Sequence, residues 1–257
     1  MTEHTAAPIS ACIITFNEED RIAHCIRALH FCQEVLVVDS HSTDRTREIA
    51  AGLGARVVER DWPGYRSQKE FAIRNAQHDW VLSIDADERV TPSLRESIEY
   101  WRARGFADYA GFRCSRATEY FGRFLRHGNA YPDKVVRLFD RRRGRFRGYE
   151  VHENTEVEGR IVDLAGDLEH FSYRNLTDQQ RRLQRYATLM AESMNQAGKQ
   201  AGIGKLIVNP GWRFLRGYLL RLGFLDGWRG LVYAWMEAGY VREKYLRLFL
   251  LRRRHPT

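Results

Sequence analysis

Short apolar runs that end at polar or acidic loops recur through the first third of the chain. Three of them cover residues 9–15, 35–38 and 81–84, and a fourth candidate strand covers residues 56–59. Runs of this length with β-branched residues are typical of buried strands. The segments between them carry apolar residues at helical spacing. This alternation predicts an α/β fold with a mostly parallel sheet flanked by helices.

Carboxylates follow these predicted strands. The run over residues 81–84 leads directly into Asp85-Ala86-Asp87-Glu88. In extended backbone, residues two apart point the same way, so Asp85 and Asp87 can present oxygens to one hard divalent cation. The first run leads into Asn17-Glu18, and the second ends at Asp39. Since ligands bind at the carboxyl edge of such sheets, these side chains are expected to line one site.

The loops after the predicted strands contain neither a Gly-x-Gly-x-x-Gly motif nor a Gly-Lys-Ser/Thr motif. This makes a dinucleotide oxidoreductase or a P-loop ATPase improbable, because both hold phosphate on a glycine-rich turn. A nucleotide diphosphate bound here would need a metal on Asp87 to neutralise it. Cations such as Lys69 would assist.

The end of the chain is basic and aromatic. Residues 212–254 hold ten of the Lys and Arg residues and three of the Asp and Glu residues, which is nearly the whole excess behind the net charge of +8. They contain no uncharged apolar stretch of roughly 18 residues, so they should not span a bilayer. Aromatic side chains interleaved with arginines favour binding at an anionic membrane surface. The alternative is a set of helices that pack on the catalytic domain with solvated arginines.

The cysteine spacing and the first eight residues indicate in which cellular compartment the protein is expected. The four cysteines show no Cys-x-x-Cys pair, and residues 1–8 lack the basic start and apolar core of a signal peptide. We therefore expect reduced thiols and a cytoplasmic protein. The basic, aromatic end of the chain would hold this protein peripherally on the inner face of the cytoplasmic membrane.

Several ordered blocks together resemble the family 2 glycosyltransferases of GT-A fold, and within them the bacterial lipopolysaccharide core glucosyltransferases. The blocks cover most of the chain: Ile14-Thr15-Phe16-Asn17-Glu18-Glu19, Val37-Val38-Asp39-Ser40 with Ser42-Thr43-Asp44, Gln68-Lys69, Asp79-Trp80-Val81-Leu82 with Asp85-Ala86-Asp87-Glu88, Arg137-Leu138-Phe139 and Val151-His152-Glu153. The resemblance implies a GT-A catalytic domain over residues 1–175, with a donor half over about 9–90 and an acceptor half over about 91–175. Residues 176–257 would form a helical extension.

The resemblance also implies roles for individual residues. Those expected to bind the nucleotide-sugar donor are Thr15, Asn17, Glu18, Asp39, Lys69, Asp85 and Arg137. Asp87, with Asp85 and His170, is expected at a Mg2+ or Mn2+ ion. Glu153 matches the acid that deprotonates the acceptor in this family. The chain departs from the family at Ser40-His41-Ser42, where Asp-Gly-Ser is familiar, and at His152-Glu153, where many members have Glu-Asp.

The expected function is inverting, metal-dependent transfer of a hexose, glucose from UDP-glucose, to the heptose region of the lipopolysaccharide inner core. The partners would be the donor, a lipid-linked glycan acceptor and an anionic inner-membrane surface, with no nucleic acid. One alternative acceptor is a polyprenyl phosphate or another cell-envelope glycan. Two alternatives of other classes are a nucleotidyltransferase and a non-catalytic basic protein that binds membranes or nucleic acid.

Overall fold

The computed structural model describes residues 6–106, 108–149 and 152–254. The chain forms two compact units. The first spans Met1–Arg116 and Lys134–His170, and the second spans Ala117–Asp133 and Phe171–Thr257. Residues 117–133 therefore belong with the C-terminal helices, although they precede the domain boundary expected near residue 175. That boundary stays a prediction about functional domains.

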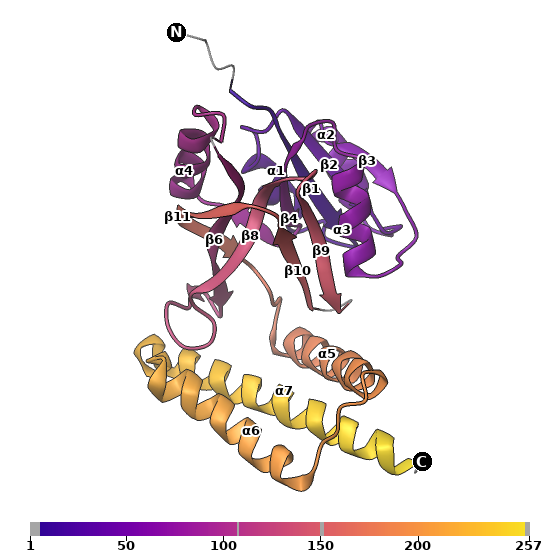
Figure 1. The fold of residues 1–257 in the computed structure, drawn as a ribbon, viewed down its shortest axis with the longest axis vertical. Helices are drawn as coiled ribbons and strands as arrows, with labels where there is room; N and C mark the ends of the chain where they lie inside the picture. Colours follow the sequence, from indigo (N-terminus) through magenta and orange to yellow (C-terminus); the bar gives the residue numbers. More distant parts are fainter. Residues whose placement is uncertain (1–5, 107, 150–151, 255–257) are drawn as a thin grey trace. The chain divides into compact units, whose positions relative to one another are not determined.

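The first unit is built on a mixed sheet (Figure 1). Its strands are β1 (Ile9–Thr15), β2 (Glu34–Asp39), β3 (Arg56–Glu59), β4 (Trp80–Asp85), β5 (Glu88–Val90), β6 (Tyr109–Tyr120), β8 (Asp133–Asp140) and β11 (Arg160–His170), in the order β3-β2-β1-β4-β8-β6-β11-β5. The first four strands of that order run parallel, and β8 pairs antiparallel with β4. The predicted strands over residues 9–15 and 56–59 are confirmed with the same bounds.

The register of the parallel strands brings the acidic loops together. Thr15 pairs with Asp39 across β1 and β2, and Ile14 pairs with Asp85 across β1 and β4. The ends of three parallel strands thus meet at one edge of the sheet. This arrangement confirms the α/β fold expected from the sequence.

Helices cover both faces of the sheet. They are α1 (Ile22–Arg27), α2 (Thr46–Gly52), α3 (Tyr65–Arg74) and α4 (Pro92–Arg102). Alternate residues of β1 enter different cores, because successive side chains of a strand point to opposite faces. Ile13 packs in one core with residues of α1, α2 and α4, whereas Cys12 packs in the other with residues of α3. The sheet is therefore a buried middle layer.

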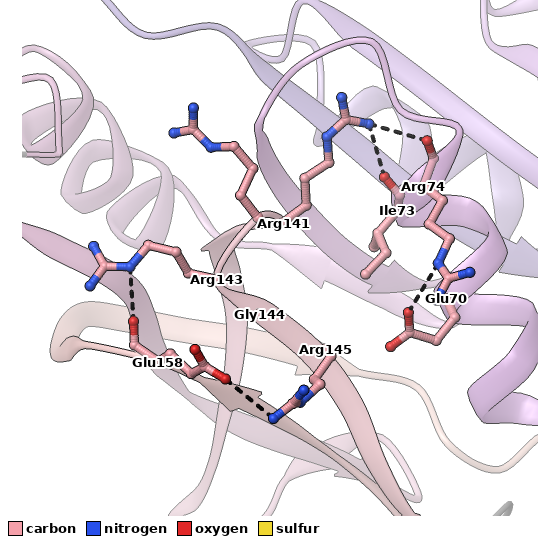
Figure 2. Close-up of a pocket in the computed structure, with 9 residues that line it drawn as sticks. Glu70, Ile73, Arg74, Arg141, Arg143, Gly144, Arg145 and Glu158 are labelled. Carbon is pink, nitrogen blue, oxygen red and sulfur yellow. Dashed lines mark hydrogen bonds and ion pairs between the residues drawn. The ribbon is translucent and has the colours of Figure 1, made fainter.

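A short hairpin lies beside α3. Its strands are β9 (Gly144–Tyr149) and β10 (His152–Val157), paired antiparallel. A cavity of about 260 Å³ opens where this hairpin starts, next to the end of α3 (Figure 2). Arginines dominate its lining.

The second unit is mostly helical. It contains the short strand β7 (Arg123–Phe124), α5 (Leu176–Gln196), α6 (Ile203–Leu215), the π-helical turn η1 (Arg216–Leu220), the 3-10 turn η2 (Gly223–Asp226) and α7 (Gly227–Arg254). Ala191 and Met194 of α5 pack against Leu248 of α7. α5 begins at the first residue of the helical extension expected over residues 176–257. Among the described residues, no helix combines the length and the low polarity that crossing a bilayer requires.

Candidate active site

Two cations hold Asp85 at the end of β4. The Nζ of Lys69, from α3, lies 2.8 Å from one carboxylate oxygen, and the Nη2 of Arg137, from β8, lies 3.0 Å from the other. Lys69 and Arg137 are both buried. The structure therefore brings together three residues that the sequence assigned to the donor.

These ion pairs dominate the electrostatics of Asp85. Burial raises the pKa of its carboxyl, but Lys69 and Arg137 outweigh burial and hold the pKa well below its usual value. Arg137 behaves reciprocally: burial lowers the pKa of its guanidinium, and the carboxylates of Glu88 and Asp85 more than reverse that shift. Asp85 is thus ionised at neutral pH, as a ligand-binding carboxylate must be.

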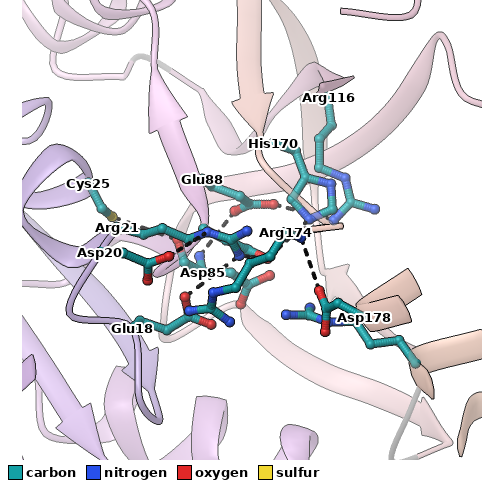
Figure 3. A network of polar contacts seen from close by, with 12 residues as sticks. Glu18, Asp20, Arg21, Cys25, Asp85, Glu88, Arg116, His170, Arg174 and Asp178 are labelled. Atoms are coloured by element: carbon teal, nitrogen blue, oxygen red, sulfur yellow. Dashed lines mark hydrogen bonds and ion pairs between the residues drawn. The ribbon is translucent and has the colours of Figure 1, made fainter. Parts of the chain in front are cut away.

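Glu88 lies at the centre of this network, although no sequence pattern indicated a role for it (Figure 3). Its side chain is buried and accepts a hydrogen bond from the guanidinium of Arg137. It also accepts from Arg116 of β6 at 3.3 Å and from the backbone N–H of Asp85 at 3.1 Å. Glu88 therefore fixes both the backbone of Asp85 and the arginine that pairs with it.

The carboxylate of Asp87 lies between the guanidinium of Arg21 and the imidazole of His170. Its Oδ2 is 3.9 Å from the Nη1 of Arg21 and 3.6 Å from the Nε2 of His170. His170 ends β11 and pairs with Glu88 of β5 in the antiparallel ladder. The expected proximity of His170 and Asp87 is thus present in the structure.

The side chains around Asp87 fit a divalent ion that brings further ligands with it. Within the described part of the chain, no three His, Cys, Asp or Glu side chains converge into a preformed metal cage. Mg2+ is usually held by one or two carboxylates together with substrate phosphates rather than by an all-protein cage. Asp87, partly exposed beside His170, offers such a carboxylate. The residues therefore fit an ion that arrives with a diphosphate.

The loops after β1 and β2 are bonded to each other. The backbone N–H of Asn17 donates to the hydroxyl of Ser42 at 2.9 Å, and the side-chain oxygen of Asn17 accepts from the backbone N–H of Thr43 at 2.8 Å. Glu18 continues this pattern, because its N–H donates to the hydroxyl of Thr46 at 2.8 Å. The two loops form one wall at the edge of the sheet.

Asp39 and Thr15 lie at the base of that wall. Asp39 is fully buried and accepts hydrogen bonds from the N–H and the hydroxyl of Ser42, at 2.7 and 2.5 Å. Thr15 is also buried, and its hydroxyl has no hydrogen-bond partner among the described residues. A buried hydroxyl without a partner beside the loop wall is a place where a ligand can bond.

The predicted base lies on a strand of the short hairpin. Glu153 belongs to β10, where it pairs with Gly148 of β9, but its side chain lies outside the described part of the molecule. Its assignment stays a prediction.

Three contributors to this site were missed from the sequence. They are Glu88, Arg21 and Arg116. The spacing of Arg21 from Glu18 at the start of α1 is a usable signal, since residues three apart are neighbours at a helix start and their charged groups lie 3.6 Å apart. Arg116 follows Glu88 by 28 residues, and no local pattern joins them.

Comparison with known proteins identifies the family. The family model described as glycosyl transferase family 2 matches residues 10–157, more than half of the chain. The chain is a family 2 glycosyltransferase. The matched span of this glycosyltransferase includes β1, β2, β4 and β10, and hence most of the residues described above.

Relatives of this glycosyltransferase match it along nearly its full length. The lipopolysaccharide core biosynthesis glycosyltransferase LpsC of Rhizobium meliloti is 32% identical over 252 residues, which cover 93% of each chain. An uncharacterized glycosyltransferase of Rickettsia typhi is 33% identical, over 95% of this chain and 86% of the relative. The likeness includes the C-terminal helices as well as the sheet.

A solved structure supports the GT-A fold. A mannosyltransferase of Pyrobaculum calidifontis, in complex with GDP-Man and Mn2+, aligns with a TM-score of 0.56 at 13% identity, over 96% of this chain and 88% of its own. At that identity the likeness concerns the fold alone. Membership of the family leaves no place for the nucleotidyltransferase or the non-catalytic protein considered from the sequence.

Proposed function

We propose that this glycosyltransferase moves glucose from UDP-glucose to a heptose of the lipopolysaccharide inner core. The observation that carries the proposal is the identity with LpsC, named for lipopolysaccharide core biosynthesis, across 93% of both chains. The other acceptors retained from the sequence, a polyprenyl phosphate or another cell-envelope glycan, are compatible with the same donor site. A panel of acceptors separates them.

The geometry supports a division of labour among the donor residues. The proposed nucleoside side is the loop wall with Thr15, Asn17, Glu18 and Asp39. The proposed diphosphate side is Asp87 with His170, supported by the cations Lys69 and Arg137 on Asp85. A Mg2+ or Mn2+ ion held by Asp87, with Asp85 close by, would neutralise charge on the leaving diphosphate.

Glu153 is the proposed base on the acceptor side. Inverting transfer requires a group that accepts the proton of the acceptor hydroxyl on the face opposite the leaving group. Glu153 follows the hairpin turn in a strand separate from the Asp85 network. Donor and acceptor chemistry are thus assigned to separate carboxylates.

Release of UDP during transfer tests the proposal. With purified protein, UDP-glucose, Mn2+ and a heptose-terminated core acceptor, we expect UDP and a glucosylated product detectable by mass spectrometry. Asp87→Ala or EDTA should lower the rate by at least roughly a hundredfold, the loss expected when stabilisation of a developing charge is removed. Full activity under either condition would rule out the metal role of Asp87.

The proposed location is the cytoplasmic face of the inner membrane, held by the helical extension over residues 176–257. Its support is a set of exposed apolar side chains on α6, η1, η2 and the start of α7: Ile203, Ile207, Val208, Trp212, Leu215, Leu219, Leu220, Phe224, Leu225, Trp228 and Trp235. No residue of α6 is buried. A helix with apolar and basic residues can lie in the interface between lipid headgroups and acyl chains.

A further inference from the structure

The cavity at the start of the β9–β10 hairpin is lined mainly by arginines (Figure 2). The charged residues that line it are Arg74, Arg141, Arg142, Arg143, Arg145, Glu70 and Glu158. Five cations face two anions in one concave site. Such a site attracts anionic groups, because like charges in a hollow reinforce one another.

Two of the arginines are structural. The Nη1 of Arg141 donates to the backbone carbonyls of Ile73, Arg74 and Ala76, at 3.2, 3.3 and 2.5 Å, and so closes the end of α3. Arg142 pairs with Asp140 and lies 3.0 Å from Asp79. The charges of these two arginines still contribute to the potential in the cavity, but most of their N–H groups already bond to the protein.

The other arginines keep donors for a ligand. Among the described residues, Arg143 uses its Nε on the carbonyl of Glu158 at 2.8 Å, and Arg145 uses one Nη on the carboxylate of Glu158 at 3.2 Å. Arg74 approaches Glu70 only to 3.7 Å. A guanidinium has five N–H donors in a fixed fork, which matches the oxygens of a phosphate. Each of these three side chains therefore has N–H groups that a phosphate could accept.

The hairpin connects the cavity to the proposed base. Gly144, in the cavity, pairs with Val157, and Glu153 pairs with Gly148 four residues further along the ladder. At about 3.3 Å per residue, four residues span about 13 Å. A glycan that lies along the hairpin could place an anionic group in the cavity while its hydroxyl reaches Glu153.

We propose that this cavity binds a phosphate group of the acceptor glycan and so selects acceptors phosphorylated about 13 Å from the reacting hydroxyl. The proposal rests on the proposed function, because it takes the acceptor to be a glycan and Glu153 to be the base. The shared chemistry is a phosphate monoester or diester. A phospholipid headgroup is the competing source of that group.

Binding is tested first with inorganic phosphate. The melting temperature is measured in saturating UDP, which occupies the donor site, with and without phosphate. Wild type should be stabilised by phosphate, and R143Q/R145Q should lose most of that stabilisation. The matched control is Arg113→Gln, which removes an exposed arginine paired with Asp163 elsewhere in the first unit. An equal phosphate effect in all three proteins would overturn the site.

The acceptor is tested next, with core oligosaccharide before and after phosphatase treatment. R143Q/R145Q should raise the KM for the phosphorylated acceptor by at least roughly tenfold, since the loss of even one of the two charge-assisted contacts has that effect, and leave the KM for the treated acceptor unchanged. Equal KM changes for both acceptors would contradict the proposal. So would unchanged KM values with weakened binding to phosphatidylglycerol vesicles, which would assign the cavity to lipid.

Failure of the proposed function gives a different pattern. If UDP is not the donor nucleotide, UDP will not stabilise any of the three proteins. The phosphate effect and its loss in R143Q/R145Q do not depend on that result. The two proposals can therefore fail separately.

Discussion

Glu88 and Asp163 are carboxylates with two cationic partners each, in opposite surroundings. Glu88 is buried between Arg137 and Arg116, whereas the side chain of Asp163 is 42% exposed between Arg113 and Lys134. The ion pairs with Arg113 and Lys134 lower the pKa of Asp163 to about 2. Solvent nevertheless screens such exposed pairs, so a large pKa shift there does not imply a large contribution to stability.

This contrast gives a prediction at the residue scale. Glu88→Gln should reduce the free energy of unfolding by about 3 kcal/mol, because it removes the buried negative charge that Arg137 and Arg116 share. It should also lower donor affinity, since Arg137 and the backbone of Asp85 lose their support. Urea unfolding and titration with UDP measure the two effects.

Asp163→Asn is the control for Glu88→Gln. Its effect on unfolding should stay below about 1 kcal/mol, and UDP binding should be unchanged. Similar losses of unfolding free energy in both variants would show that burial does not determine how much these ion pairs contribute to stability.

The strands differ in how well their bounds could be predicted from the sequence. Residues 9–15 form a strand with the predicted bounds, and every residue of it is buried. Residues 56–59 also match, although only Val57 and Val58 are apolar and no residue of this strand is buried. β6 runs from Tyr109 to Tyr120, and only residues 110–112 at its start form an apolar segment. Its later residues alternate between buried and half-buried without a clear apolar pattern, so the local sequence gives no signal.

The residues of the candidate site also differ in how far the sequence predicted them. The position of Asp85, Asp87 and Asp39 at the edge of the sheet could be predicted, because each lies within two residues of the end of a recognisable strand. Some partners could not, since Arg21 reaches Asp87 across 66 residues of sequence and Arg116 reaches Glu88 across 28. Long-range contacts leave no periodic signature in a single sequence.

Packing of the β9–β10 hairpin gives a prediction at the element scale. A Cβ at Gly144 would lie 2.3 Å from the ring of Phe139, which is buried in β8. Gly144→Ala should therefore destabilise the protein by about 1–3 kcal/mol through overpacking. Thermal unfolding by calorimetry measures this loss.

Gly52→Ala serves as its control, because nothing lies within 4 Å of a Cβ at that helical position. Its effect should be neutral or slightly stabilising, by about 0.5 kcal/mol. A neutral Gly144→Ala would mean that Phe139 moves aside without cost.

At the scale of the whole molecule, the exposed apolar side chains of the second unit predict lipid binding. Wild type should sediment with phosphatidylglycerol vesicles and less with phosphatidylcholine vesicles, and high salt should weaken binding because arginines contribute. Ile207→Glu with Trp212→Glu should weaken binding by at least roughly tenfold, since each charge opposes burial in the interface. Both positions are more than half exposed, at 70% and 54%, so folding should be retained.

Ile161→Glu is the matched control. Ile161 is an exposed apolar residue of β11 in the first unit, and its replacement should leave sedimentation unchanged. Equal sedimentation of wild type and the α6 variant would refute the membrane proposal.

The hydrogen bonds between the loops after β1 and β2 have a consequence for the thermodynamics of donor recognition. Asn17 adopts a left-handed backbone at φ 54° and is held there by Ser42 and Thr43 of the other loop. The loops thus have a defined shape without help from a nucleotide. Binding free energy need not be spent on restricting their conformational freedom, and a preorganised pocket of this kind favours tight association with little rearrangement of the backbone.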